Sequence, residues 1–91
     1  MKQCMDVDAV TNRLKRIEGQ VRGIIKMIED DKSCEDILIQ IGSAKAALHK
    51  TGQVVLEGHL HHCVLDGIHE GKEDETLKKL SSAIEQFSRI V

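Results

Sequence analysis

In the stretch VTNRLKRIEGQVRGIIKMI (residues 10–28), hydrophobic residues return at steps of four and three. Residues three and four apart lie on one face of an α-helix, so the spacing predicts an amphipathic helix with a heptad-like apolar stripe. We expect this helix over residues 8–30, where the polar run EDDKS ends the pattern. The stripe consists of Val10, Leu14, Ile17, Val21, Ile24 and Ile28.

A second, longer helix is predicted over residues 34–68, with Ser33 as its N-cap. Its centre, GSAKAAL, consists mostly of small residues. Gly52 and Gly58 each lower helix propensity by about 1 kcal/mol relative to alanine, but no cluster of turn residues interrupts the pattern. We therefore expect one continuous helix across both glycines.

A third helix is predicted over residues 75–90, after a loop in which Gly71 is the expected helix stop. The sequence thus predicts a single all-α domain over residues 1–91, built as a three-helix subunit. A middle helix of about 34 residues would extend past its two neighbours in a monomer. We therefore expect an antiparallel helical-bundle dimer.

Composition excludes several classes of protein. The chain has 31% charged and 41% hydrophobic residues and no proline, which is typical of a folded helical protein. No apolar run is long enough to span a membrane and no apolar leader opens the chain, so we expect a cytoplasmic location. The three cysteines favour metal-bound, reactive or buried thiols over a disulfide framework. No catalytic constellation is present, and we expect no enzyme.

The segment EGHLHHCVLDG (residues 57–67) contains a candidate metal site. His59 and Cys63 are four residues apart, and Cys34 falls on the same stripe of the predicted helix. Cys34 and His59 are 25 positions apart, about 37 Å along a helix, so one straight helix cannot bring them to one ion. An antiparallel second copy that crosses near Ala47 and Leu48 would bring Cys34 to the partner subunit's His59 and Cys63.

The donor set indicates a soft metal ion. Two thiolates and one imidazole suit Cu(I). A fourth donor, such as Cys4 or the N-terminal amine, would favour Zn(II). Further nitrogen or oxygen donors would favour Ni(II) or Co(II). Two alternatives stay open. His59 and Cys63 could be ordinary packing residues, or Cys34 and Cys63 could form a redox pair that senses sulfur species. The remaining histidines are predicted to be surface residues: His49, His61, His62 and His69.

Positive charge is concentrated in residues 12–26, with five basic residues and one acidic residue in a chain whose net charge is −2. Arg13, Arg16 and Gln20 flank one side of the apolar stripe, where they are suited to bind phosphates or base edges. The other flank carries Lys15, Arg22 and Lys26. An amphipathic helix ordinarily carries such residues on its solvated side, and no helix-turn-helix, zinc finger or aromatic stacking set accompanies them.

Three segments together, NRLKRIEGQVRGI, SCEDILIQI and EGHLHHCV, resemble the CsoR/RcnR family of bacterial metal- and stress-sensing transcriptional repressors. The resemblance implies a dimer of dimers, a disc-shaped tetramer, whose metal-free form binds double-stranded operator DNA. It implies that Cys34, His59 and Cys63 hold Cu(I) between subunits, and that binding releases the DNA and derepresses copper-export genes. It also implies DNA contacts at the basic residues Arg13, Arg16 and Lys50.

The sequence departs from the family pattern beside the first cysteine, where copper-sensing relatives often have a tyrosine and this chain has Ser33. By position, Asp74 best matches the family's acidic residue that hydrogen-bonds around the metal ligands. Nickel and cobalt sensors recruit an N-terminal donor, for which Lys2 and Cys4 are the nearest residues here.

Other family types fit less well. His59 argues against a persulfide sensor and Cys63 against a formaldehyde sensor. The leading hypothesis is a Cu(I)-responsive repressor. The alternatives are a sulfur-sensing or Ni/Co/Zn-responsive repressor of the same fold, and a copper-buffering bundle that binds no DNA.

Overall fold

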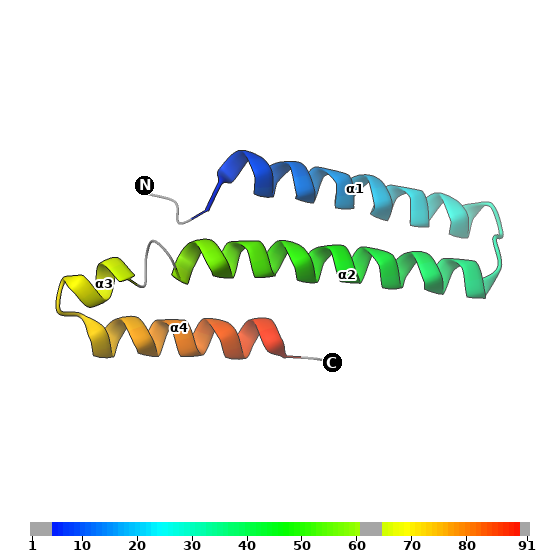
Figure 1. Cartoon of the computed structure of the whole chain (residues 1–91). Helices are drawn as coiled ribbons and strands as arrows, with labels where there is room; N and C mark the ends of the chain where they lie inside the picture. The colour runs from blue at the N-terminus through cyan, green and yellow to red at the C-terminus, as the bar shows by residue number, and fades with distance from the viewer. Residues whose placement is uncertain (1–4, 61–64, 90–91) are drawn as a thin grey trace.

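The computed structural model describes residues 5–60 and 65–89, and helices account for nearly all of them. The helices are α1 (Val7–Glu29), α2 (Cys34–Gly58), α3 (Leu65–His69) and α4 (Glu73–Ser88). Figure 1 shows α1 and α2 as an antiparallel hairpin, with α4 folded back along the other side of α2. The predicted all-α class is confirmed, with three long helices and one short helix.

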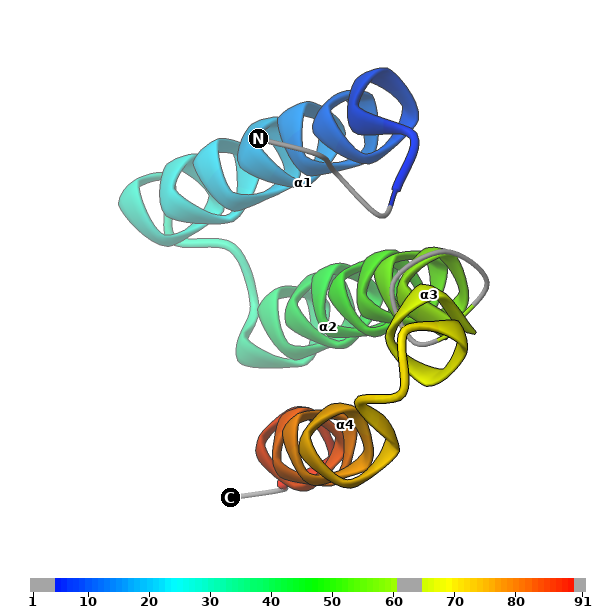
Figure 2. The same ribbon diagram turned by 90° about the vertical axis from the view of Figure 1, so that its left-hand side faces the viewer.

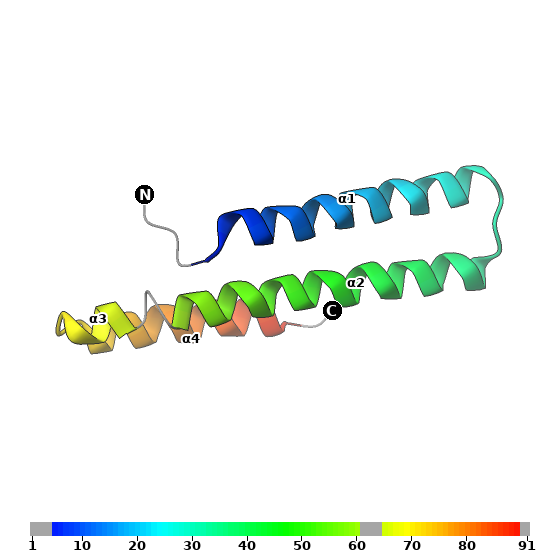
Figure 3. The same ribbon diagram turned by 45° about the horizontal axis from the view of Figure 1, so that its top comes forward.

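The helices form a thin layer rather than a closed bundle. The molecule measures 57 × 28 × 15 Å. Because a single helix with its side chains is about 10–12 Å across, the shortest dimension is little more than one helix. Figure 2 shows α2 between α1 and α4, and in Figures 2 and 3 no helix covers either flat side of the α1–α2 hairpin. Both flat sides of the α1–α2 hairpin therefore face outward in the single chain.

The core of the hairpin is small. Val10 and Ile17 of α1 are buried, as are Ala44 and Thr51 of α2. The small Ala44 allows the two helices to approach closely. Thr51 satisfies its hydroxyl within its own helix, because its Oγ1 donates a hydrogen bond of 2.8 Å to the Ala47 carbonyl.

The turn after α1 is a Schellman motif with an aspartate in the left-handed position. The Asp31 N–H donates to the Ile28 carbonyl (3.2 Å) and the Lys32 N–H to the Met27 carbonyl (3.0 Å). Asp31 has φ +58°, a conformation that glycine ordinarily supplies at this position. The polar run that was predicted to end the first helix therefore ends it by a defined motif, at a strained residue.

Side-chain caps fix the starts of both hairpin helices. Ser33 Oγ accepts a hydrogen bond of 3.1 Å from the Asp36 N–H, which confirms Ser33 as the N-cap of α2. Asp6 caps α1 in the same way, with its carboxylate accepting from the Ala9 N–H at 3.1 Å. Ser33 thus has a local structural role at the start of α2.

The prediction of one helix over residues 34–68 is wrong. α2 ends at Gly58, His59 and Leu60 follow in a wider π-type turn, and α3 is a separate helix. The lower helix propensity of Gly58 is the local reason, and α3 packs against α4 instead of extending α2. α2 has 25 residues and α1 has 23, so the overhang expected of the middle helix is absent.

The predicted helix stop at Gly71 is confirmed. Gly71 has φ +76°, its N–H donates to the Ile68 carbonyl (3.0 Å), and the Lys72 N–H donates to the Gly67 carbonyl (2.9 Å). These two bonds form a second Schellman motif. The next helix, α4, begins two residues earlier than predicted and ends at Ser88, also two residues early.

One aromatic side chain attaches α4 to α2. The Phe87 ring stacks on His49 with centroids 5.3 Å apart and an interplanar angle of 11°. It also covers Gly52, where an added Cβ would come within 2.5 Å of Phe87 Cζ. Among its described residues, α4 has none that is buried. Phe87 therefore contacts α2 at two positions one helical turn apart, His49 and Gly52.

Large hydrophobic side chains remain exposed on the hairpin. On α1, Val7, Leu14, Val21 and Ile28 are 42–58% exposed, and on α2 Ile41 and Leu48 are 45% and 49% exposed. A contiguous apolar surface of this kind is typical of a protein–protein interface. Within the described segments, no helix combines the length and apolar character needed to cross a membrane.

Candidate metal site and nucleic-acid interface

Cys34 and His59, two of the three predicted metal donors, lie at opposite ends of α2. Cys34 is the first residue of the helix, exposed and with a free thiol. His59 is half-buried and follows the last residue, with its N–H directed at the Val55 and Leu56 carbonyls. The helix between them is about 37 Å long, so one chain cannot bring both to the same ion.

Cys63, the third predicted donor, lies outside the described residues. Among residues 5–60 and 65–89, no group of three His, Cys, Asp or Glu side chains is close enough to hold a metal ion. The predicted separation of Cys34 from His59 within one subunit is confirmed. The predicted site between subunits remains a prediction.

The two described donors share one side of the hairpin with the exposed apolar stripes. Thr51 marks the side of α2 that faces α1. At about 100° per residue, Leu48, Ile41, His59 and Cys34 are all rotated from it in the same sense, by about 60–100°. On α1, Leu14 is rotated by about 60° from the buried Ile17, also toward this side. We call the side formed by Cys34, Ile41, Leu48, His59 and the stripe Val7, Leu14, Val21 and Ile28 the apolar face.

The opposite side of the hairpin contains a cleft lined by Arg13, Arg16, Ile17, Gln20, Ala47 and Thr51. Its position follows from the same rotation, because Arg13 and Gln20 lie about 40–60° from Ile17 in the sense opposite to Leu14. We call it the basic cleft. Lys50 is exposed and is rotated about 100° from Thr51 toward this side. The three predicted DNA-contact residues thus share one side, opposite Cys34 and His59.

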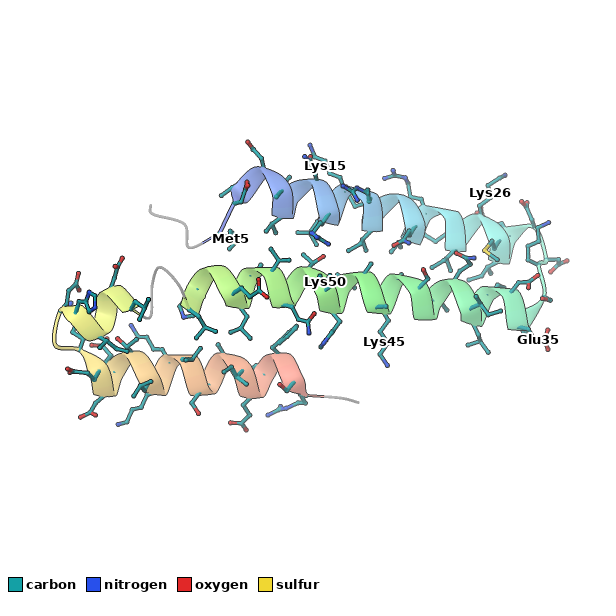
Figure 4. All side chains as sticks on the ribbon, in the orientation of Figure 1. Met5, Lys15, Lys26, Glu35, Lys45 and Lys50 are labelled. Atoms are coloured by element: carbon teal, nitrogen blue, oxygen red, sulfur yellow. The ribbon has the colours of Figure 1, made fainter. Side chains whose placement is uncertain are left out.

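The other basic residues of α1 are arranged differently. Figure 4 shows Lys15 and Lys26 on the outer side of α1, pointing away from α2. Lys26 pairs with Asp30 at 3.5 Å, whereas neither Arg13 nor Arg16 takes part in an ion pair among the described residues. The two arginines of the basic cleft therefore keep their guanidinium groups available to a ligand.

Asp74, predicted to support the metal ligands, lies in the exposed first turn of α4. Figure 1 shows this turn at the end of the molecule where α2 finishes, on the His59 side rather than the Cys34 side. Its neighbour Glu75 accepts from Lys79 Nζ at 3.1 Å, and this hydrogen bond and the lysine charge lower the pKa of Glu75. A contact of Asp74 with metal ligands remains a prediction.

Two features escaped sequence reasoning because they depend on tertiary packing. Gln20, which lines the basic cleft, has a buried Oε1 that no described residue hydrogen-bonds. His49 is exposed, as predicted, but stacks on Phe87 over Gly52. The glycine three residues after His49 was the available signal, since a helix-interior glycine often marks a close approach of another element.

Comparison with known proteins places this geometry in a family. A family model described as "Metal-sensitive transcriptional repressor" matches residues 6–86. The chain is 44% identical over 88 residues to the copper-sensing transcriptional repressor CsoR of Bacillus subtilis, covering 97% of this chain and 87% of that protein. It is also 44% identical over 84 residues to the copper-sensing transcriptional repressor RicR of Mycobacterium tuberculosis, and this match covers 90% of this chain and 88% of RicR.

Solved structures agree with the sequence matches. The crystal structure of the copper-sensing repressor CsoR with Cu(I) from Geobacillus thermodenitrificans superposes with a TM-score of 0.87 at 47% identity, covering 91% of this chain and 86% of that one. The nickel-responsive transcriptional regulator InrS gives a TM-score of 0.82 at 29% identity, and the superposition covers 96% of this chain and 98% of the InrS chain. These relatives are repressors and regulators, which confirms that the chain is no enzyme. The chain belongs to the metal-sensitive transcriptional repressors of the CsoR/RcnR family.

Proposed function

We propose that this protein is a Cu(I)-responsive transcriptional repressor. Its metal-free form binds double-stranded operator DNA in the cytoplasm, and Cu(I) binding releases the DNA so that copper-export genes are expressed. The observation that carries the proposal is the division of the hairpin into two sides. Two candidate metal donors, Cys34 and His59, lie on the apolar face, and the basic cleft lies on the other side of the same two helices.

The apolar face supports an antiparallel dimer. Its exposed stripes on α1 and α2 repeat every seven residues, the pattern with which helices pack side by side. Two hairpins joined through these faces would form a four-helix bundle and bury the stripes. The family resemblance supports the further assembly of two such dimers into a disc-shaped tetramer.

The dimer would complete the metal site. Because Cys34 and His59 are at opposite ends of α2, antiparallel pairing sets Cys34 beside the partner subunit's His59 and Cys63. Two-fold symmetry then gives two equivalent sites per dimer. Two thiolates and one imidazole fit a three-coordinate Cu(I) ion, which would supply a covalent link between the subunits. Both thiols must lose their protons, so affinity for the metal should fall at low pH.

Release of DNA requires that the two conformational states bind the metal unequally. Cys34 and the partner subunit's His59 would be drawn together, which favours one arrangement of the two hairpins. Since α1 and α2 carry the apolar face on one side and the basic cleft on the other, a shift between subunits also changes the spacing of their basic clefts. Arg13, Arg16 and Lys50 would then no longer match the phosphates of one duplex.

The decisive test is X-ray absorption spectroscopy on the anaerobic Cu(I) protein beside its His59→Ala variant. The proposal expects a three-coordinate site with two sulfur scatterers and one imidazole, and loss of the imidazole in the variant. An unchanged spectrum would remove His59 from the site. Tight, DNA-releasing binding of Ni(II) in place of Cu(I) would identify a nickel sensor, in line with the similarity to InrS.

DNA binding is tested with a duplex selected from a randomised pool by the metal-free protein. Fluorescence anisotropy should show tight binding that Cu(I) abolishes, and Arg13→Met or Arg16→Met should weaken it and lower the salt dependence. Failure to select any duplex would favour a copper buffer. Release by persulfide with a Cys34–Cys63 crosslink, and none by Cu(I), would favour the sulfur-sensing alternative.

A further inference from the structure

Gln20, which lines the basic cleft, has a polar side-chain atom without a partner. Its Oε1 is buried and accepts no hydrogen bond from any of the described residues. Buried polar atoms are nearly always hydrogen-bonded, so an exception calls for a donor that arrives later. Gln20 lines a cleft whose other polar side chains are Arg13, Arg16 and Thr51. The identity of the missing donor is therefore restricted to these groups or to a ligand.

Thr51 is not the donor, because its hydroxyl already donates to the Ala47 carbonyl at 2.8 Å. A phosphate is not the donor either, because its oxygens only accept. Of the two arginines, Arg16 is four residues before Gln20, the spacing at which helix side chains are neighbours. Arg16 is exposed and lies in no ion pair among the described residues, so its guanidinium is able to turn toward Gln20.

We propose that Gln20 is a positioning residue for phosphate recognition: its Oε1 accepts a hydrogen bond from the Arg16 guanidinium when that group binds a phosphate of the DNA backbone at the basic cleft. The inference rests on the proposed DNA-binding function and deepens it. A guanidinium has five N–H donors in a planar fork. Two of them hold a phosphate in bidentate geometry while another reaches Gln20. In the absence of phosphate, water solvates the exposed guanidinium, and Gln20 Oε1 stays without a partner.

This arrangement predicts effects of opposite sign on stability and on DNA binding. Gln20→Met keeps the length of the side chain but removes the buried acceptor, so the metal-free protein should unfold at an equal or higher temperature than wild type. The same variant should bind the selected duplex about tenfold more weakly, with an unchanged dependence on salt, because no charge is lost. Arg16→Met should weaken binding and also lower the salt slope by about 1.

Two further variants sharpen the test. Gln20→Glu should weaken DNA binding more than Gln20→Met, because a carboxylate pairs with Arg16 and repels phosphate. Gln53→Met makes the matched substitution at an exposed position on α2 outside the basic cleft, and should bind like wild type. Anisotropy with the selected duplex and thermal unfolding followed by circular dichroism are measured for all variants.

Wild-type affinity in Gln20→Met together with weakened binding in Arg16→Met would overturn the role of Gln20 and leave the proposed function standing. Full affinity in Arg16→Met would overturn the proposed roles of both Arg16 and Gln20, whereas the binding of the duplex itself would leave the proposed function standing. A fall in unfolding temperature in Gln20→Met that accompanies its loss of DNA binding would also overturn the proposal, as a structural effect. Inorganic phosphate, at ionic strength matched with chloride, should raise the unfolding temperature of wild type more than that of Gln20→Met, because the contact between Gln20 and Arg16 forms on any phosphate bound at the cleft. The same difference in a protein for which no duplex can be selected would assign the cleft to free phosphate instead.

Discussion

At the scale of single residues, the structure shows one position where the amino acid and the backbone disagree. Asp31 occupies the left-handed region with φ +58°, at the place in a Schellman motif where glycine is most common. Aspartate tolerates this region better than most residues, but its Cβ still crowds the backbone. The equivalent place after α3 is filled by Gly71, with φ +76°.

Asp31→Gly should therefore stabilise the protein by about 0.5–1 kcal/mol, the net of relieved strain and the greater freedom of glycine in the unfolded chain. Urea unfolding followed by circular dichroism measures the change. Gly71→Ala is the converse control and should destabilise by about 1 kcal/mol, since it places a Cβ in the same backbone region. A loss of stability in Asp31→Gly would show that the Asp31 side chain stabilises the folded protein by more than the backbone strain at this position destabilises it.

At the scale of the helix, α4 depends on the contact of Phe87 with Gly52 and His49. Gly52→Ala should displace the ring and loosen α4, although alanine raises helix propensity by about 1 kcal/mol. Gly23→Ala is the matched control, because nothing lies within 4 Å of its added Cβ, and it should stabilise by that amount. Hydrogen exchange of the α4 amides reports the difference.

Combining Gly52→Ala with Phe87→Leu tests the cause, because the smaller side chain makes room for the new methyl group. The double variant should show less loss of protection in α4 than the sum of the two single variants. Additive losses would indicate that Gly52 affects α4 by another route.

The first turns of α4 should also respond to pH. The ion pair with Lys79 lowers the pKa of Glu75 below its usual 4.5 in the folded protein. A carboxylate with a lowered folded pKa contributes stability above its ordinary pKa, and this contribution disappears as the pH falls through the folded value. Because both groups are exposed, the effect is small. Glu75→Gln should therefore reduce thermal stability slightly at pH 7, and the difference from wild type should vanish in acid. If the difference in thermal stability persists at low pH, its cause is something other than the charge of Glu75.

Local signals predicted most of the helix boundaries, while features set by packing escaped prediction. The hydrophobic period of α1, the cap at Ser33 and the stop at Gly71 each depend on a few neighbouring residues. The end of α2 at Gly58 depends on how α3 packs against α4. The burial of Gln20 Oε1 depends on how α1 packs against α2, which the sequence does not show. The spacing of Cys34 and His59 was predictable because helical rotation alone places both on one side.

At the scale of the whole molecule, a layer one helix thick leaves the apolar face uncovered. Leu48→Glu places a charge in the middle of this face and should convert the proposed dimer to a monomer, as measured by sedimentation. Ile39→Glu is the matched control, because Ile39 is 65% exposed but lies on the other side of α2, and it should leave the dimer intact. The monomeric variant should also lose high-affinity Cu(I) binding. Retained tight binding would place the site within one chain.

A mixed dimer tests directly whether the metal site requires two chains. One chain carries Cys34→Ala and the other carries His59→Ala with Cys63→Ala, and the two are purified together through different tags. Each homodimer lacks a donor at both sites, so neither should bind Cu(I) tightly. In the mixed dimer, the intact Cys34 of one chain meets the partner subunit's His59 and Cys63, which restores a single site per dimer. Competition with a Cu(I) chelator measures the stoichiometry. A site formed within one chain would stay broken in every combination, because neither chain holds all three donors.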